Sequence, residues 1–205
     1  MKLYYMPGAC SMVPHTALEW TGQPYEAQAA NMQLIKSPDY LKLNPQGAVP
    51  LLVDGELVLP QNVAILQYLD ARFPQARLFG SDTIEGRARA WRWLAFLNAD
   101  VHKAFGPVFH MPAYAKGKPE FEAAIQQAAR DSIVAMLAQA DAHLAGQEHL
   151  GDALSVADVY LYVLLRWCRS IQLDLGSLPR LAPFFARIGA NPGVQAVIAQ
   201  EGLKP

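Results

Sequence analysis

The stretch Val49-Pro50-Leu51-Leu52-Val53-Asp54-Gly55-Glu56-Leu57-Val58-Leu59 contains two short apolar runs joined by Asp54-Gly55. Both central residues of a tight hairpin turn need positive φ angles, which Asp-Gly adopts readily. The stretch therefore predicts a β-hairpin. Val49-Pro50 opens the first strand of the hairpin, and a proline at the first residue of a strand is tolerated on an edge.

The segments on both sides of this hairpin alternate between strand and helix patterns. The breakers Pro7-Gly8 and Gly22 end the first strand and the first helix. The predicted elements are strand 2–5, helix 11–21, strand 25–30, a short helix 38–42, the hairpin 49–59 and helix 61–72. This order, β-α-β-α-β-β-α, predicts a small α/β domain in about 80 residues.

Beyond residue 80 the pattern is helical throughout. Of 32 alanines, 23 lie in residues 81–205, whereas 8 of 15 prolines lie in the first 80 residues. Long helices are expected at 84–105, interrupted by Gly106-Pro107, and at 119–144. Ser155 and Asp158 form a capping box, with Leu154 and Val159 as a staple, at the start of a third helix. The linker is expected within residues 73–82.

Composition excludes several classes of function. The 205 residues carry 17 Lys+Arg against 18 Asp+Glu, a net charge of -1, whereas a general nucleic-acid binder has a basic excess. No apolar run reaches the length of a membrane span or signal peptide. Two cysteines are too few for a disulfide scaffold, and no histidine has defensible metal spacing. These features predict a soluble, cytoplasmic protein without a metal, and the few charges leave apolar surface for a subunit interface.

Cys10 lies where a strand gives way to a helix start. The free N–H groups and positive dipole end of that helix are expected to lower the pKa of its thiol. A small buried hydrophobe is an equally good interpretation of a lone cysteine. The sequence Cys10-Ser11-Met12-Val13 has no second cysteine, so redox chemistry here needs an external thiol.

The other candidates also carry two interpretations each. Val49 offers backbone groups to an extended ligand if the Val49-Pro50 bond is cis, and the sequence leaves the isomer open. Gln61-Asn62, at a helix start, suits a carboxylate or simply caps the helix. His102-Lys103 is either catalytic or a surface pair. Phe105, Phe109 and Trp167 form either a substrate pocket or core.

In this order along the whole chain, five motifs resemble those of glutathione transferases. They are Met1-Lys2-Leu3-Tyr4-Tyr5 with Pro7-Gly8-Ala9-Cys10-Ser11, Asn44-Pro45-Gln46-Gly47-Ala48-Val49-Pro50, Ala64-Ile65-Leu66-Gln67-Tyr68-Leu69, Val101-His102-Lys103-Ala104-Phe105 and Ser155-Val156-Ala157-Asp158. The cysteine after Pro-Gly-Ala and the His-Lys pair are similar to the bacterial beta class.

The resemblance implies a fold and a function. The fold is a thioredoxin-like glutathione-binding domain over residues 1–76, followed by an all-α domain over residues 83–205 that contributes the electrophile pocket and dimer contacts. The implied function is the transfer of glutathione, as co-substrate and without another cofactor, to small apolar electrophiles. A homodimer is implied as well; the absence of a nucleic-acid or membrane partner is expected from the composition alone.

The resemblance also implies roles for single residues. Cys10 and His102 are the catalytic candidates, and Cys10 can form a mixed disulfide with glutathione. Val49, with Pro50 cis, would bind the cysteinyl part, and Gln61 and Asn62 the γ-glutamyl end. The remaining implied glutathione contacts are Ala9, Lys36, Lys103 and Asp100. Of these, Lys36 would bind the glycine carboxylate, and Asp100 would reach the γ-glutamyl ammonium of the glutathione bound by the partner subunit. The implied electrophile pocket consists of Phe105, Phe109 and Trp167.

One departure from the family pattern concerns charge. The family usually has an acidic residue followed by Ser or Gly where this chain has Gln61-Asn62. A neutral amide cannot balance the positive charge of the ligand's ammonium group, so a weaker affinity for glutathione is expected. Two rival hypotheses follow: glutaredoxin-like thiol-disulfide exchange through Cys10, and a non-catalytic binding protein on the same fold.

Overall fold

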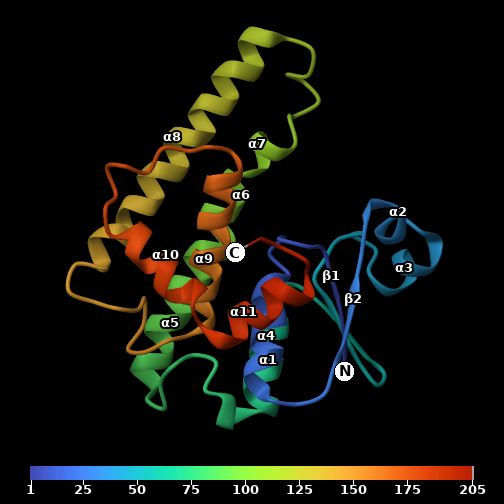
Figure 1. Cartoon of the computed structure of the whole chain (residues 1–205). Coiled ribbons are helices and arrows are strands. Elements are labelled where there is room, and N and C mark those ends of the chain that lie inside the picture. Colours follow the sequence, from blue (N-terminus) through green and yellow to red (C-terminus); the bar gives the residue numbers. More distant parts are fainter. Residues whose placement is uncertain (205) are drawn as a thin grey trace.

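Four short strands form one mixed sheet in the first half of the chain. The computed structural model describes residues 1–204 (Figure 1). The strands are β1 (Lys2–Tyr5), β2 (Glu26–Ala29), β3 (Leu51–Asp54) and β4 (Leu57–Pro60), in the order β2-β1-β3-β4. β1 pairs with β2 in parallel and with β3 antiparallel, and β3 pairs antiparallel with β4.

The predicted hairpin is confirmed, with two corrections. Asp54 pairs with Leu57, so the turn consists of Gly55 and Glu56, and of these only Gly55 has a positive φ, 61°. β3 lies between β1 and β4 and is not an edge strand. Pro50 is tolerated there because it precedes the strand and owes no hydrogen bond to the ladder.

Helices cover both faces of this sheet. The predicted helices are confirmed as α1 (Met12–Thr21), α3 (Pro38–Leu43) and α4 (Asn62–Arg72), and a short α2 (Met32–Ile35) was not predicted. Leu3 and Tyr5 of β1 belong to the main core with α1 and α4, whereas Tyr4 packs into a smaller core with α2 and α3. This alternation follows from the two-residue period of a strand. A 3₁₀ turn, Pro74–Ala76, follows α4.

The remainder of the chain described, to residue 204, is helical, as predicted. The helices are α5 (Ile84–Phe96), α6 (His102–Ala104), α7 (Gly106–Phe109), α8 (Pro119–His143), α9 (Val156–Ser170), α10 (Leu181–Gly189) and α11 (Pro192–Gln200). The expected continuous helix at 84–105 is wrong in one respect, because a π-helical turn, Leu97–Val101, separates α5 from α6. Pro205, the last residue of the predicted second domain, lies outside the described residues.

The start of α9 is fixed by the predicted capping box. The Asp158 carboxylate accepts hydrogen bonds from the Ser155 N–H and the Ser155 hydroxyl, each at 2.9 Å, and from the Leu150 N–H at 2.9 Å. The loop that follows α4 lies against the start of α9, because the Val156 N–H donates to the Leu78 carbonyl at 2.9 Å. Gly80 has φ 67°, and a Cβ on it would lie 2.8 Å from the Ala153 carbonyl oxygen.

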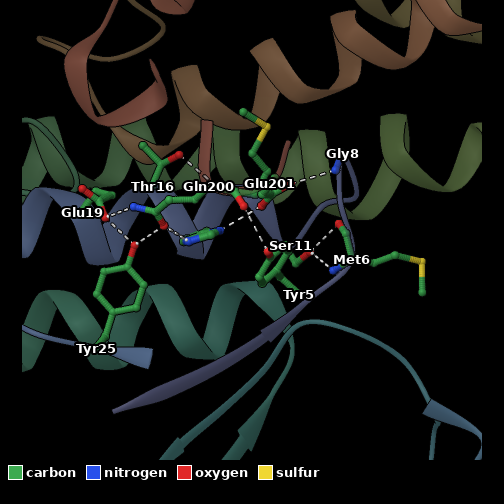
Figure 2. A network of polar contacts seen from close by, with 11 residues as sticks. Tyr5, Met6, Gly8, Ser11, Thr16, Glu19, Tyr25, Gln200 and Glu201 are labelled. Carbon is green, nitrogen blue, oxygen red and sulfur yellow. Dashed lines mark hydrogen bonds and ion pairs between the residues drawn. The ribbon is translucent and has the colours of Figure 1, made fainter. Parts of the chain in front are cut away.

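Helix α1 joins the two halves of the chain, packing against both α9 and α11. Figure 2 shows a polar network along this contact, with Tyr25 at one end and Gly8 at the other. His15 of α1 is completely buried and contacts the Glu201 carboxylate at 2.9 Å through Nδ1 and Gln200 Oε1 at 2.8 Å through Nε2. The second Glu201 oxygen accepts the Gly8 N–H at 2.8 Å.

No helix within residues 1–204 has both the length and the apolar composition that crossing a membrane requires.

Asp158→Ala should lower the free energy of unfolding by about 2–4 kcal/mol, because a buried carboxylate that serves three donors is lost. Urea denaturation measures this change. Asp131→Ala, on the exposed surface of α8, is the control and should change stability by less than about 0.5 kcal/mol. An equal loss of unfolding free energy in the two variants would contradict the conclusion that the Asp158 carboxylate stabilises the start of α9.

Candidate active site

A cavity of about 330 Å³ lies between the sheet domain and the helices that follow it. Seven of the predicted site residues line it: Cys10, Val49, Pro50, Gln61, Asn62, His102 and Lys103. They come from the loop before α1, the start of β3, the start of α4, and α6. Residues more than 90 positions apart in the sequence therefore share one cavity.

Cys10 lies in the turn just before α1, with its Sγ 3.9 Å from the Val49 carbonyl oxygen. The expectation of a lowered thiol pKa is wrong, because burial raises the pKa of Cys10 above its ordinary value. The Asn62 side chain and the backbone N–H groups of Cys10 and Ser11 act in the opposite direction and only partly offset burial. Cys10 is therefore a protonated thiol near neutral pH, able to donate a hydrogen bond into the cavity.

The ligand-facing backbone next to Cys10 has two unusual features. The Val49-Pro50 peptide bond is cis, which answers the question that the sequence left open. Gln61 has φ 79° and ψ 123°, a conformation that non-glycine residues rarely adopt and that concentrates at binding sites. The exposed Gln61 side chain donates to Gln46 Oε1 at 2.8 Å across the cavity mouth.

Asn62 lies deeper in the cavity wall and is 4% exposed. Its Nδ2 donates to the Tyr160 hydroxyl at 3.5 Å. Its Oδ1 is buried and has no hydrogen-bond partner within residues 1–204. Neither Gln61 nor Asn62 caps α4 through its side chain, since the cap position of that helix has no side-chain hydrogen bond. The simple capping interpretation of this pair is therefore wrong.

His102 is a titratable group that lines the same cavity as Cys10. Its Nδ1 lies 2.7 Å from the Tyr160 hydroxyl, and its ring forms a T-shaped pair with the Trp167 ring at a centroid distance of 4.8 Å. Tyr160 in turn donates to Asn98 Oδ1 at 3.0 Å. Burial lowers the pKa of His102, so its ring is neutral at neutral pH and can accept a proton.

The other predicted contacts lie outside the cavity wall. Ala9 precedes Cys10 but does not line the cavity, and exposed Lys36 donates to the Gly47 carbonyl at 3.0 Å, next to its edge. Asp100 is exposed and does not line this cavity.

The three aromatic residues form one cluster beside His102. Trp167 meets Phe105 at 5.3 Å and Phe109 at 5.4 Å between ring centroids. Phe105 is completely buried, as a core residue is, whereas Phe109 is 42% exposed. The Trp167 indole N–H donates to the Gly8 carbonyl at 2.8 Å and so contacts the loop that carries Cys10.

Sequence reasoning missed several residues of the site. The cavity is also lined by Asn44, Gln46, Ala48, Pro60 and Asn98. The first three belong to the quoted Asn-Pro-Gln-Gly-Ala motif, which could have been assigned in full. Tyr160 could have been noticed as a polar side chain inside the apolar start of α9. Among residues 1–204 no group of three or more His, Cys, Asp or Glu side chains is placed to hold a metal ion.

Comparison with known proteins identifies the family. Residues 3–77 match the family model "Glutathione S-transferase, N-terminal domain", and residues 122–198 match "Glutathione S-transferase, C-terminal domain". The chain belongs to the glutathione S-transferase family. Its thioredoxin-like domain with a four-stranded mixed sheet, followed by a helical domain, is the fold that the sequence predicted.

Full-length relatives support this assignment. A glutathione S-transferase of Xanthomonas campestris is 44% identical over 99% of this chain and 100% of its own. The structure of a sphingomonad glutathione S-transferase complexed with glutathione superposes with a TM-score of 0.86, at 38% identity over 100% of both chains. A beta-class enzyme of Sphingomonas chungbukensis has a TM-score of 0.87, at 35% identity over 100% of both chains. The predicted similarity to the bacterial beta class is thus confirmed.

Asn62→Leu should raise the pKa of Cys10 further, because it removes an amide that favours the thiolate while keeping a similar volume. The thiolate fraction at a given pH then falls, and alkylation of Cys10 at pH 8 should slow about tenfold. Mass spectrometry separates this adduct from one on the buried Cys168.

Gln61→Leu is the matched control, since the Gln61 side chain contacts Gln46 and not Cys10. It should leave the alkylation rate unchanged. An Asn62→Leu rate equal to or above that of the wild type would show that the Asn62 amide does not act on the thiol.

Proposed function

We propose that this chain transfers the thiol of glutathione to small apolar electrophiles, with glutathione as co-substrate and no other cofactor. The observation that carries the proposal is the cavity in which Cys10, Asn62 and His102 meet. It joins the thioredoxin-like half, proposed as residues 1–76, to the helical half, proposed as residues 83–205. The glutathione-bound sphingomonad relative, similar over its whole length, supports the choice of ligand.

In this proposal the ligand lies along the cavity wall. The backbone of Val49, before the cis Pro50, binds the cysteinyl part, and Gln61 and Asn62 receive the γ-glutamyl end. Lys103 lines the cavity and Lys36 lies at its edge, so their ammonium groups attract the carboxylates of the peptide. Ala9 borders the ligand through its position beside Cys10.

Cys10 and His102 then have different roles in activating the thiol of glutathione. The neutral His102 ring accepts the proton of the glutathione thiol, and the Cys10 thiol donates a hydrogen bond to the resulting thiolate. The thiolate attacks the electrophilic carbon, a sulfur–carbon bond forms, and the leaving group departs with its electron pair. The partly exposed Phe109 and Trp167, backed by buried Phe105, offer the apolar contact for the electrophile.

The proposal includes a homodimer in the cytoplasm. Ile84 of α5 is 82% exposed, and it borders an apolar groove with Trp91 on the same helix, a surface that suits a partner subunit. Asp100, exposed and outside this chain's own cavity, is free to reach the partner subunit's γ-glutamyl ammonium. The free thiols of Cys10 and Cys168 suit a reducing compartment.

His102→Gln should lower kcat for conjugation at least tenfold, because it removes the proton acceptor. Cys10→Ala should lower kcat severalfold, because it removes one hydrogen-bond donor to the thiolate. A panel of aromatic halides and other apolar electrophiles, assayed with glutathione, measures both. Cys168→Ala, a buried cysteine of α9 away from the cavity, should retain wild-type activity.

Failure of the wild type with every electrophile would overturn the transferase proposal, and two further measurements then choose between the rivals. A glutathione adduct on Cys10 after treatment with oxidised glutathione, with turnover of mixed disulfides, would indicate thiol-disulfide exchange. The raised pKa of Cys10 argues against that activity. Calorimetric binding of glutathione without either activity would indicate a binding protein.

Gln61→Glu should lower the KM for glutathione about tenfold, because a carboxylate gives the ligand's ammonium a charge-assisted hydrogen bond where the amide gives a neutral one. Steady-state kinetics with varied glutathione measures it. Gln67→Glu makes the same change on the exposed face of α4, outside the cavity, and should have no effect. An unchanged KM in Gln61→Glu would show that the ammonium group of glutathione does not bind next to residue 61.

A further inference from the structure

Tyr160 places a hydroxyl at the point where both halves of the molecule meet. It lies in the apolar first half of α9 and is completely buried. Three polar atoms from different elements surround its oxygen: His102 Nδ1 at 2.7 Å, Asn98 Oδ1 at 3.0 Å and Asn62 Nδ2 at 3.5 Å. Such a convergence on one buried hydroxyl sets the direction of each hydrogen bond around it.

Counting hydrogens assigns the proton on His102. A phenol donates one hydrogen bond and accepts two. Asn98 Oδ1 can only accept, so it takes the Tyr160 hydrogen, whereas Asn62 Nδ2 can only donate. The Tyr160 oxygen then has one lone pair left, with which it can accept a hydrogen bond from the imidazole, but it has no hydrogen left to donate to it. His102 must therefore carry a hydrogen on Nδ1.

We propose that Tyr160 is a positioning residue for the reaction, which holds His102 in the tautomer protonated on Nδ1 so that Nε2 is left bare as the proton acceptor in the cavity. His102 lines the cavity, and in the part of the chain that the structure describes Nε2 has no hydrogen-bond partner. This inference rests on the proposed role of His102 and adds the group that orients it.

A ring contact and the neighbouring π-helical turn also fix the position of His102. The His102 ring packs against the Trp167 ring at an interplanar angle of 78°, and this contact restricts rotation about the His102 side-chain bonds. The π-helical turn that carries Asn98 ends at Val101, directly before His102, so two of the three partners of the Tyr160 hydroxyl lie close together in the sequence. Such turns are frequent at functional sites.

The charges around His102 agree with a neutral ring. The titratable groups near it are Tyr160 of α9, which contacts its Nδ1, and Cys10 and Lys103, which line the same cavity. Burial raises the pKa of Tyr160 far above its ordinary value, with the nearby Cys10 as a smaller cause. The hydroxyl is thus a permanent donor to Asn98 across the working pH range.

The tautomer can be observed without any substrate. In protein labelled with ¹⁵N-histidine, proton–nitrogen correlation spectra at pH 7.5 distinguish a protonated ring nitrogen from a bare one. His102→Gln identifies the His102 signals among the five histidines. We expect Nδ1 protonated and Nε2 bare in the wild type, and a mixture of tautomers in Tyr160→Phe. A wild-type Nε2 that carries the hydrogen would overturn the proposal.

Kinetics test whether this orientation matters to the reaction. Tyr160→Phe should lower kcat about tenfold and leave the KM for glutathione within about twofold, because Tyr160 orients the base without touching the ligand. The acidic limb of kcat/KM should move to lower pH. The phenyl ring accepts no hydrogen bond from Nδ1–H, so the protonated ring loses stabilisation and the pKa of His102 falls further.

Tyr162→Phe is the matched control. Tyr162 is equally buried on α9, two residues on, and its hydroxyl accepts from Arg166 at 3.3 Å while its ring stacks on Phe185, away from the cavity. It should keep wild-type kcat and pH dependence. Equal losses of kcat in both variants, tracking their melting temperatures, would reduce Tyr160 to a structural role and overturn the proposal. An inactive wild type that still shows the Nδ1 tautomer would instead count against the transferase function alone.

Discussion

The position of the Cys10 thiol depends on how one glycine is held. The Gly8 N–H donates to Glu201 and the Gly8 carbonyl accepts from Trp167, so both backbone groups of this residue are bound by the helical half of the chain. Glu201 is itself held by the completely buried His15 of α1 (Figure 2). Removing one partner of this buried contact would leave the other polar group without a hydrogen bond, which typically costs about 1–3 kcal/mol. The loop that carries Cys10 is therefore shaped by residues nearly two hundred positions away.

Features encoded locally could be predicted from the sequence, and features that depend on distant contacts could not. The hairpin at Gly55 and the capping box of Ser155 and Asp158 follow from a few neighbouring residues, and both are present in the structure. The family motifs likewise placed Cys10, Val49 and His102 in one cavity. The role of Tyr160 could not be predicted, because it depends on contacts with His102, which is 58 residues away, and with Asn62, which is 98 residues away. The π-helical turn at Leu97–Val101 has no recognisable signal either, since its sequence is also compatible with a regular helix.

The thiol of Cys10 shows why a helix start alone does not predict reactivity. A helix dipole contributes about 0.3–1 kcal/mol at an exposed end, whereas burial of an ionisable group can shift its pKa by several units. Burial is the larger effect at Cys10, and three hydrogen-bond donors only moderate it. The position of a cysteine in the sequence gives the first of these quantities, and only the packed structure gives the second. A protonated Cys10 acts through its hydrogen, which suits a site whose nucleophile comes from the ligand.

The interior of the site is polar but carries little charge. Asn62, Asn98, Tyr160 and a neutral His102 connect there through hydrogen bonds, while the charged Lys36 and Lys103 are exposed. In a low-dielectric interior, fixed dipoles stabilise a developing negative charge without the cost of reorganising water. A permanent buried cation beside the thiol would stabilise the thiolate more, but it would also weaken its attack as a nucleophile. The arrangement of neutral groups therefore suits a thiolate that must form in the cavity and then react.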